Sequence, residues 1–274
     1  MDCVIFDGRE FAARIEKDLH DRVVELTRQL GRRPKLVSIL VGDDGPSAMY
    51  LGLKQKMAQR LGIEFTRVGL APGDIDGAKE SIMVANSDLE VDGIMVQLPV
   101  MDSLGKPIEK KTQQQVLDDI SNDKDIDGLT TDSKFLPGAA RSVIEILLEL
   151  QDSGQISDLG SKSIVVIGAA GMVGKSVVKS LSGRGFDVIG MDKVDFDKKR
   201  LVSADIVISA TGQAGLVTPD LVKEGVIAID VGAPKGEFAP EVVGKAAFLT
   251  PVPGGVGPVT VACLFANLVD KVAS

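Results

Sequence analysis

The sequence predicts an α/β fold made of two domains. The chain has 274 residues, which exceeds the roughly 100–200 residues typical of one domain. Short runs rich in Val and Ile alternate with segments of helical periodicity, a pattern typical of parallel sheets whose strands are joined by helical crossovers. Gly-containing turns follow several of these runs, and ligands bind at such carboxyl ends of strands.

The strand-like runs are short and mostly apolar on both faces, as expected for strands buried in a parallel sheet. They occupy residues 36–42, 63–70, 93–100, 163–169, 186–192, 205–212 and 226–232. Helices are predicted between them because apolar residues recur every three to four positions. These helices cover residues 9–30, 46–61, 74–85, 141–154, 172–182 and 258–274.

The domain boundary is predicted near residue 136. The segment 141–154 reads as a long helix that ends at Gly154 and is suited to bridging two domains. We therefore assign residues 1–136, with the C-terminal helix 258–274, to the first domain and residues 137–257 to the second.

Composition and charge exclude several classes of protein. Hydrophobic residues make up 44% and charged residues 26%, as in ordinary globular chains, which excludes disordered, collagen-like and coiled-coil proteins. The net charge of −8 argues against general nucleic-acid binding. No apolar stretch approaches the about 18 residues that span a bilayer, and the N-terminus lacks the pattern of a secretory signal. A cytoplasmic protein without membrane or nucleic-acid partners is expected.

The residue types available limit the chemistry. The two cysteines, Cys3 and Cys263, are too few for a metal cluster and have no reason to pair in an unexported chain. The single histidine, His20, lies beside the apolar stripe of the first helix and is expected to be a solvated surface residue. Catalysis must therefore use lysine, carboxylates, amides, backbone groups or a bound cofactor, and no metal site is predicted.

A glycine turn joins a predicted strand to a predicted helix in SIVVIGAAGMVGKS. Its glycines at 168, 171 and 174 form G-x-x-G-x-x-G, with Ala170 at the second glycine position of the G-x-G-x-x-G pattern. Glycines here let backbone N–H groups approach a phosphate at a helix N-terminus. The alternative is a tight strand-to-helix turn without a ligand.

Three polar side chains are candidates for a reactive site. Tyr50 and Lys54 lie four residues apart on one helix face, where a tyrosine can stack on a flat ligand while a lysine reaches a reacting atom. Gln97 ends a buried strand and points into any cleft at that strand end. The alternatives are a surface lysine beside a half-buried tyrosine, and a glutamine that satisfies loop backbone.

Two further segments are unusual. NDKDIDG carries Asp123, Asp125 and Asp127, but it lacks the terminal acidic ligand of a calcium loop. TPVPGGVGPVT, residues 250–260, is a rigid loop that either holds backbone close to a flat ligand or makes a stiff connection.

Together these segments resemble the bifunctional methylenetetrahydrofolate dehydrogenase/methenyltetrahydrofolate cyclohydrolase family. The resemblance covers nearly the whole chain, in the family's order and at near-family spacing. The matching segments are LVGDDGPSAMYLGLKQK, VDGIMVQLPV, DKDIDGL, IVVIGAAGMVGKS, ATGQAG, AIDVG and TPVPGGVGPVTVA.

The resemblance implies an N-terminal folate-binding catalytic domain and a C-terminal Rossmann-like domain that binds NADP, with the folate in the cleft. It implies oxidation of 5,10-methylenetetrahydrofolate to the 5,10-methenyl form and hydrolysis of that product to 10-formyltetrahydrofolate. These reactions belong to one-carbon metabolism and purine biosynthesis. The family usually forms homodimers through its Rossmann domains.

The resemblance also implies residue roles. Lys54 matches the catalytic lysine, Tyr50 the tyrosine that stacks on folate, Gln97 the amide that orients the lysine, and Asp127 the acid that hydrogen-bonds the pterin. The substrate-binding set comprises Tyr50, Gln97, Leu98, Pro99, Asp127, Pro253, Gly254, Gly255 and Pro258. The cofactor-binding set comprises Gly168, Ala169, Ala170, Gly171, Met172, Val173, Gly174, Asp192, Lys193, Ala210, Thr211, Gly212, Val231 and Gly232.

The chain departs from the family at several positions. Pro137-Gly138-Ala139-Ala140 stands where the family usually has Pro-Cys-Thr-Pro, Ala170 where serine is common, and Ser176 where proline is common. MDKVD replaces the family's His-Ser-Lys/Arg-Thr stretch. Asp192, 24 positions after Gly168, suits a ribose 2′-hydroxyl, whereas Lys193 suits a 2′-phosphate. NADP is the expected cofactor and NAD the alternative.

Two other functions remain open from the sequence. One is an enzyme of the same fold with only the dehydrogenase activity. The other is a non-catalytic regulatory protein that binds nucleotide. The joint presence of Tyr50, Lys54, Gln97 and Asp127 favours an enzyme, because no packing need requires all four.

Overall fold

The computed structural model describes residues 3–42 and 45–274, so Asp43 and Asp44 of the segment LVGDDGPSAMYLGLKQK lie outside the description. The chain divides into two compact units. The six-stranded unit comprises the N-terminal segment through Ala13 and Ala139–Thr260, and the three-stranded unit comprises Arg14–Gly138 and Val261–Ser274. Each unit is named here after its sheet.

The start of the chain differs from the predicted domain boundary, which groups residues 1–136 together. Strand β1, Val4–Ile5, pairs in parallel with β9, Ala246–Leu249. The amide of Phe6 also donates to the carbonyl oxygen of Leu249 at 3.0 Å. These long-range hydrogen bonds attach the N-terminal segment to the larger sheet, and periodicity along the sequence carries no signal for such pairing.

The three-stranded unit is built on a parallel sheet in the order β3-β2-β4. Its elements are β2 (Lys35–Val41), α2 (Pro46–Leu61), β3 (Glu64–Leu70), α3 (Ile75–Ser87), β4 (Gly93–Val96) and α4 (Lys110–Leu117). The predicted strands and helices are present, and α4 was not predicted. Strand β4 ends at Val96 rather than at residue 100, and the cis peptide between Leu98 and Pro99 follows it.

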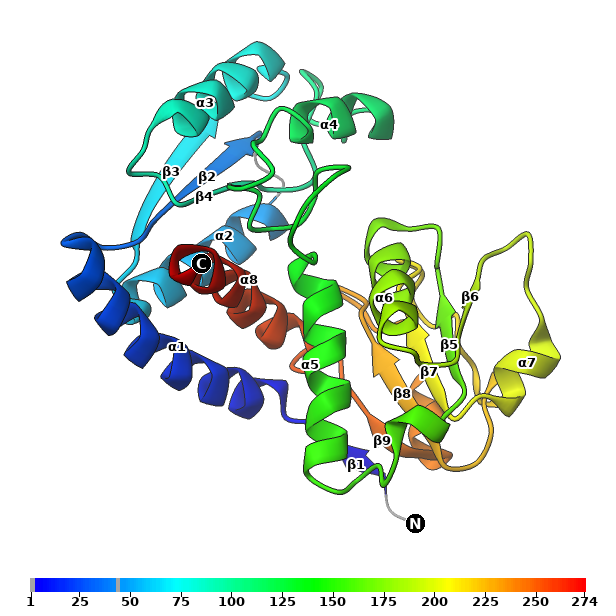
Figure 1. The fold of residues 1–274 in the computed structure, drawn as a ribbon. Helices are drawn as coiled ribbons and strands as arrows, with labels where there is room; N and C mark the ends of the chain where they lie inside the picture. Colours follow the sequence, from blue (N-terminus) through cyan, green and yellow to red (C-terminus); the bar gives the residue numbers. More distant parts are fainter. Residues whose placement is uncertain (1–2, 43–44) are drawn as a thin grey trace. The chain divides into compact units, whose positions relative to one another are not determined.

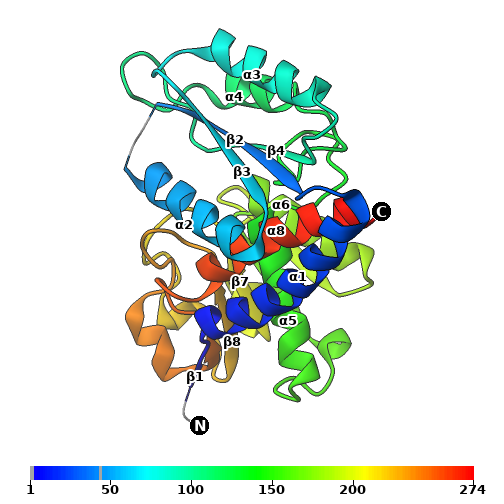
Figure 2. The same cartoon turned by 90° about the vertical axis from the view of Figure 1, so that its left-hand side faces the viewer.

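Helices α3 and α4 cover one face of this sheet and α2 lies on the other, as Figures 1 and 2 both show. Val37 and Ile39 alternate along β2 and pack with Ala78 and Ile82 of α3. Because successive side chains of a strand point to opposite faces, this alternation directs every second residue of β2 into the same core.

The order β3-β2-β4 places a topological switch point between β2 and β4. The chain leaves β2 toward β3 on one side and later returns to pair β4 on the other side. Ligands bind in open α/β sheets at such points, outside the carboxyl ends of the strands. The segment after β2 leads into α2, and the segment after β4 begins with Gln97. Both candidate segments therefore lie at the expected edge.

The six-stranded unit contains a parallel sheet in the order β1-β9-β8-β7-β5-β6. Besides β1 and β9, its elements are α5 (Gly138–Asp152), η1 (Leu159–Ser161), β5 (Ile164–Ile167), α6 (Met172–Gly183), β6 (Val188–Met191), α7 (Lys198–Ser203), β7 (Ile206–Ser209), η2 (Pro219–Leu221), β8 (Val226–Asp230) and η3 (Pro240–Gly244). Neither β1 nor β9 was predicted. The second switch point lies between β5 and β7, where the glycine turn and the ATGQAG segment begin.

The units divide at three points, within helix α1, Gly8–Leu30, at the start of α5, and within helix α8, Val256–Ala273. His20 is exposed on α1, as predicted, with Nδ1 3.4 Å from Oδ1 of Asp21. By length and composition α8 could cross a membrane, which corrects the expectation that no such apolar stretch exists. It is a core helix, however, because 61% of it is buried, including Phe265 and Leu268.

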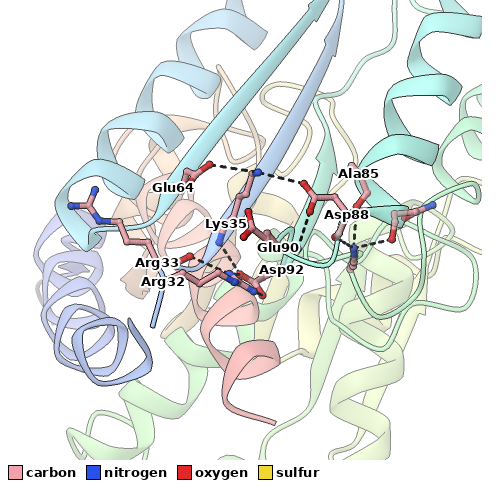
Figure 3. A network of polar contacts seen from close by, with 10 residues as sticks. Arg32, Arg33, Lys35, Glu64, Ala85, Asp88, Glu90 and Asp92 are labelled. Atoms are coloured by element: carbon pink, nitrogen blue, oxygen red, sulfur yellow. Dashed lines mark hydrogen bonds and ion pairs between the residues drawn. The ribbon is translucent and has the colours of Figure 1, made fainter. Parts of the chain in front are cut away.

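A charged network joins β2, α3 and the segment before β4 (Figure 3). The guanidinium of Arg32 donates to both carboxylate oxygens of Asp92, at 2.7 and 3.0 Å. The amide of Lys35 donates to the same carboxylate, and its Nζ lies 3.4 Å from Asp88. Bidentate guanidinium–carboxylate pairs fix geometry, so this network sets the register in which β2 and β4 begin.

Candidate active site

The amine of Lys54 is buried at the carboxyl edge of the three-stranded sheet. Helix α2 carries it, with 9% of the residue exposed. Its Nζ donates to Oε1 of Gln97 at 3.0 Å and lies 3.9 Å from Oδ2 of Asp127. The structure thus brings together three of the four residues predicted to be catalytic. The fourth, Tyr50, is half-buried and lies one helical turn before Lys54, where it shares the same helix face.

The orientation of Gln97 is set by the backbone around it. The backbone N–H of Gln97 donates to the carbonyl oxygen of Ile39 at 2.8 Å, which extends the pairing of β4 with β2 by one residue. Its side-chain Nε2 donates to the carbonyl oxygen of Leu98 at 3.1 Å. Because Nε2 is engaged there, Oε1 is directed to the lysine amine. A neutral acceptor therefore holds the amine without adding charge.

Burial and charge act in opposite directions on Lys54. Removal from water disfavours the ammonium form and lowers the pKa of Lys54, while the carboxylate of Asp127 partly opposes this change. Burial likewise raises the pKa of Asp127; Lys54 and the amide of Gly138 oppose this shift, and Asp125 reinforces it. A lysine with a lowered pKa can act as a general base near neutrality.

The loop that carries Asp127 is supported by its neighbours. The carboxylate of Asp125, fully buried, accepts hydrogen bonds from the amides of Leu129 and Thr130 at 3.2 and 2.9 Å. Nζ of Lys124 donates to the carbonyl oxygens of Ala85, Asn86 and Asp88 at the end of α3. Asp123 pairs with Lys134. The aspartates of NDKDIDG therefore have separate structural partners, and among the described residues no group of three or more possible ligands gathers around a metal site.

Asn267 is a supporting residue that the sequence reasoning missed. It is buried in α8, and Nδ2 donates to the carbonyl oxygens of Ile126 and Leu136 at 2.8 and 2.9 Å. Ile126 directly precedes Asp127, and Leu136 lies nine positions after it. An asparagine inside an otherwise apolar helical run, LFANLV, was the available signal, because a buried amide requires hydrogen-bond partners.

In the six-stranded unit, the glycine turn after β5 is tightly packed. Gly168 has φ +83°, and a Cβ there would lie 2.4 Å from the carbonyl oxygen of Ala210. A Cβ on Gly174 would lie 2.2 Å from the carbonyl oxygen of Gly168. Only glycine fits at either position, so the turn can approach the N-terminus of α6 closely. That arrangement fits a dinucleotide phosphate, whose charge favours the first N–H groups of a helix.

The end of β6 carries carboxylates beside this turn. Oδ2 of Asp192 accepts a hydrogen bond from the amide of Ala170 at 2.7 Å, and the amide of Asp192 donates to Oδ1 of Asp195 at 2.6 Å. Lys193 is exposed. Asp192 therefore lies beside the glycine turn, and its carboxylate has a defined orientation.

Two buried carboxylates that the sequence reasoning missed hold the turns that follow β7 and β8 in the six-stranded sheet. Glu237 accepts hydrogen bonds from Ser209, Thr211 and Gly212. Asp230, the last residue of β8, accepts hydrogen bonds from the amides of Gly232, Glu237 and Phe238. The predicted cofactor residues Thr211, Gly212 and Gly232 are thus attached to acidic side chains. The available signal for Asp230 was its place as the only acid in the AIDVG motif.

The segment after β9 folds back on itself. It contains the cis peptide between Val252 and Pro253. The amide of Gly255 donates to the carbonyl oxygen of Pro251 at 2.7 Å. The amide of Gly8 donates to the carbonyl oxygen of Gly254 at 3.0 Å. A Cβ on Gly255 would lie 2.6 Å from the carbonyl oxygen of Pro251, so a residue with a side chain would clash at this position. Pro253, Gly254 and Gly255 therefore form an ordered turn.

A parallel sheet with a glycine turn at its switch point, and an α/β unit with a buried lysine held by an amide and a carboxylate, define a nucleotide-dependent enzyme. The chain belongs to the tetrahydrofolate dehydrogenase/cyclohydrolase family. Its residues 6–127 match the family's catalytic domain and residues 137–274 match its NAD(P)-binding domain. This membership confirms the family, the fold class and the pair of activities predicted by resemblance: methylenetetrahydrofolate dehydrogenase and methenyltetrahydrofolate cyclohydrolase.

Full-length relatives agree with this assignment. The chain is 36% identical to the bifunctional protein FolD of Sphingopyxis alaskensis, over 97% of this chain and 92% of the relative. It is 35% identical to the protein of the same name from Clostridium botulinum, over 96% of this chain and 95% of the relative.

Solved structures show the same architecture. The FolD methylenetetrahydrofolate dehydrogenase/cyclohydrolase of Campylobacter jejuni superposes with a TM-score of 0.86 at 32% identity, covering 99% of both chains. The Trypanosoma brucei enzyme, solved with NADP cofactor and inhibitor, also has a TM-score of 0.86, at 30% identity, covering 100% of this chain and 98% of that one.

Proposed function

We propose that Lys54 is the general base with which this chain hydrolyses 5,10-methenyltetrahydrofolate to 10-formyltetrahydrofolate. We propose further that the chain forms the methenyl compound by oxidising 5,10-methylenetetrahydrofolate with NADP. The observation that carries the proposal is the buried amine of Lys54, held 3.0 Å from the amide oxygen of Gln97 and 3.9 Å from the carboxylate of Asp127. A surface lysine, the alternative left open by the sequence, would be exposed.

The oxidation step does not require acid–base catalysis by the protein. A nicotinamide held at the glycine turn would supply the hydride acceptor for the one-carbon unit, so no protein group would have to remove a proton. The protein contributes by positioning the folate, which can account for much of a rate enhancement. We assign this work to Tyr50 as a stacking surface and to Asp127 as a partner for the polar edge of the pterin. That Leu98, Pro99, Pro253, Gly254, Gly255 and Pro258 contact substrate stays a prediction.

The hydrolysis requires proton transfer. Water attacks the methenyl carbon, and Nζ of Lys54 takes one of its protons. The carbon–nitrogen bond then breaks, and the protonated amine supplies a proton to the departing ring nitrogen, while the second water proton is released to solvent. Burial lowers the pKa of Lys54, which favours the neutral amine that the first step requires. The cationic substrate favours the same neutral form through like-charge repulsion.

The sequence-based choice of NADP depends on one side chain at the end of β6. Lys193 is exposed and adjacent to Asp192, where its ammonium can pair with a 2′-phosphate. The glycine turn and the turns after β7 and β8 are assigned to the rest of the dinucleotide: Gly168–Gly174, Ala210–Gly212, Val231 and Gly232.

One observation favours NAD as a second candidate. The carboxylate of Asp192 is fixed by the amide of Ala170, and the carboxylate of Asp195 lies against the amide of Asp192. Two carboxylates beside one lysine give this edge a negative balance, which repels a 2′-phosphate and suits a ribose 2′-hydroxyl.

We further propose a cytoplasmic homodimer that forms through the six-stranded unit. Strand β6 is at one edge of that sheet, and Val194 and Phe196, just after it, are 99% and 47% exposed. An open edge with exposed apolar side chains is a suitable surface for a second copy. Light scattering after size-exclusion chromatography tests the dimer, and a single-chain mass would reject it.

An optical assay tests the enzymatic proposal. The chain is mixed with 5,10-methylenetetrahydrofolate and either NADP or NAD, and the absorbance bands of reduced nicotinamide and methenylfolate are followed. We expect nicotinamide reduction, and we expect added methenylfolate to decay faster than it does without protein. Faster reduction of NAD than of NADP would contradict the choice of NADP, and methenylfolate decay no faster than without protein would contradict the role of Lys54 as the base.

A further inference from the structure

The carboxylate of Glu237 is buried against the turn that follows β7. Only 2% of the residue is exposed. Oε2 accepts hydrogen bonds from Oγ of Ser209 and from both the amide and Oγ1 of Thr211, the last two at 2.8 and 2.7 Å. Oε1 accepts a hydrogen bond from the amide of Gly212 at 2.7 Å. Four donors converge on a group that only accepts, which matches the bonding capacity of an ionised carboxylate.

The turn that Glu237 holds is in contact with the glycine turn. The amide of Ala210 donates to the carbonyl oxygen of Ile167 at 2.9 Å, and the space beside Gly168 is closed by the carbonyl oxygen of Ala210. A shift of the segment Ala210–Gly212 would therefore move one wall of the glycine turn. These two turns occupy the switch point between β5 and β7, where a dinucleotide is expected to bind.

A second acid fixes Glu237 itself. Oδ2 of Asp230 accepts hydrogen bonds from the amides of Glu237 and Phe238 at 2.8 and 3.0 Å, and Oδ1 accepts one from the amide of Gly232 at 2.8 Å. The backbone of Glu237 is thus anchored to the end of β8, while its side chain reaches the end of β7. The residue links the carboxyl ends of two adjacent strands.

We propose that Glu237 is a positioning residue for dinucleotide binding, acting through Thr211 and Gly212. The proposal rests on the function proposed above, in which the turn Ala210–Gly212 contacts the cofactor. A buried carboxylate with two ionic acceptor oxygens holds three backbone or side-chain donors of this turn more rigidly than a neutral group can. Pre-forming the turn removes an ordering cost that would otherwise oppose cofactor binding.

Glu237→Gln provides the main test. The side-chain amide keeps the size of the carboxylate, but its NH₂ faces at least one N–H or O–H donor. Hydrogen bonds to charged groups contribute about 1.5–3 kcal/mol, so we expect the Kd and KM for NADP and NAD to rise roughly 10- to 100-fold. Hydrolysis of methenylfolate needs no dinucleotide and should stay within about twofold of the unmodified chain. Binding is measured by calorimetry and the two activities by absorbance, in one preparation.

Two matched variants are measured beside Glu237→Gln. Glu241→Gln makes the same chemical change at an exposed position of η3 and should leave dinucleotide affinity unchanged. Glu237→Asp retains the ionic acceptors on a shorter side chain and should recover part of the lost affinity. If Glu237→Gln does not fold, Ser209→Ala removes one donor to Oε2 at a residue outside the predicted cofactor-binding set, and it should weaken dinucleotide binding several-fold.

Two results would overturn the proposal. One is an unchanged Kd for both dinucleotides in Glu237→Gln. The other is a parallel loss of hydrolysis and dinucleotide binding, which would indicate a general structural role. Failure of the proposed function would look different: the unmodified chain would bind dinucleotide but would not reduce it in the presence of methylenetetrahydrofolate.

Discussion

The side-chain amide of Asn267 donates to the carbonyl oxygen of Ile126 at 2.8 Å, across 141 positions of the chain. The same Nδ2 donates to the carbonyl oxygen of Leu136 at 2.9 Å. Asp127 directly follows Ile126, so a residue of the last helix fixes the loop that places a carboxylate near Lys54.

Replacement of Asn267 by Leu should affect both stability and catalysis. Two buried carbonyl oxygens lose their donor, and an unsatisfied buried polar group costs about 1–3 kcal/mol, so we expect the free energy of unfolding to fall by about 2 kcal/mol. The KM for the folate should rise as the Asp127 loop loosens. Asn86→Ala serves as the control, because Asn86 also donates to a backbone carbonyl, that of Asp119, in a more exposed setting. Urea unfolding with equal losses in both variants would contradict the expectation.

Lys54→Gln should separate the two reactions. General acid–base assistance contributes about 10²–10⁴-fold, so hydrolysis of methenylfolate should fall by at least that range. Hydride transfer should survive at a reduced rate, because no protein base takes part in it. Lys56→Gln, on the exposed side of α2, is the control. Equal loss of both activities would mean that Lys54 mainly holds substrate, and near-normal hydrolysis would exclude it as the base.

Asp127→Asn should change the pH dependence of hydrolysis. The carboxylate of Asp127 opposes the fall in the pKa of Lys54 that burial causes. Without that negative charge the pKa of Lys54 falls further, so the rising limb of kcat/KM against pH should move to lower pH. The kcat/KM profile reports the free enzyme, in which this geometry is seen. A limb that moves to higher pH would refute the assignment of that limb to Lys54.

The cofactor preference should respond to Lys193. If NADP is the cofactor, Lys193→Gln removes a charge-assisted hydrogen bond and should lower kcat/KM for NADP by about tenfold while leaving that for NAD unchanged. If the unmodified chain instead prefers NAD by tenfold or more, Asp192 governs the choice. Asp192→Asn should then raise kcat/KM for NADP relative to NAD. The comparison needs only initial rates with both cofactors.

Asp205→Asn should reduce stability in a pH-dependent way. Burial opposes ionisation of Asp205, but hydrogen bonds from Lys223 and Ser163 outweigh it and lower its pKa from 3.8 to about 2. A lowered pKa contributes stability above the unfolded-state value, and that contribution is lost as the pH falls from about 4 to 2. We expect a loss of about 1–2 kcal/mol at pH 7 in urea unfolding, shrinking by pH 3.

Asp220→Asn is the matched control for this prediction. Hydrogen bonds from Lys198 and Thr218 also lower the pKa of Asp220 to about 2, but its side chain is 66% exposed. Solvent screens such surface pairs, so the loss of stability should be smaller than in Asp205→Asn. Equal losses at both positions would show that burial of Asp205 adds nothing.

Local sequence predicts those elements whose signal is contained in a short stretch. The helices 9–30 and 46–61 are seen within one residue of their predicted bounds, because apolar periodicity and helix formation involve the same few turns. Strand β4 is shorter than its apolar run, since hydrophobicity continues past Val96 although the ladder does not. Strand β1 escaped prediction because a two-residue run has too few positions to show a period. Strand β9 was missed although it is as long as β5 and β7, which were predicted.

The sequence by itself determined the alternation of strands and helices and the glycine turn, because each depends on residue type and local spacing. It singled out Lys54, Gln97 and Asp127 through the motifs that resemble the family. Tertiary structure alone decided that the N-terminal strand joins the larger sheet and that Asn267 supports the Asp127 loop. It also decided that Glu237 holds the turn after β7. These are hydrogen bonds between segments remote in sequence, and their partners become defined only when the strands have paired and the helices have packed.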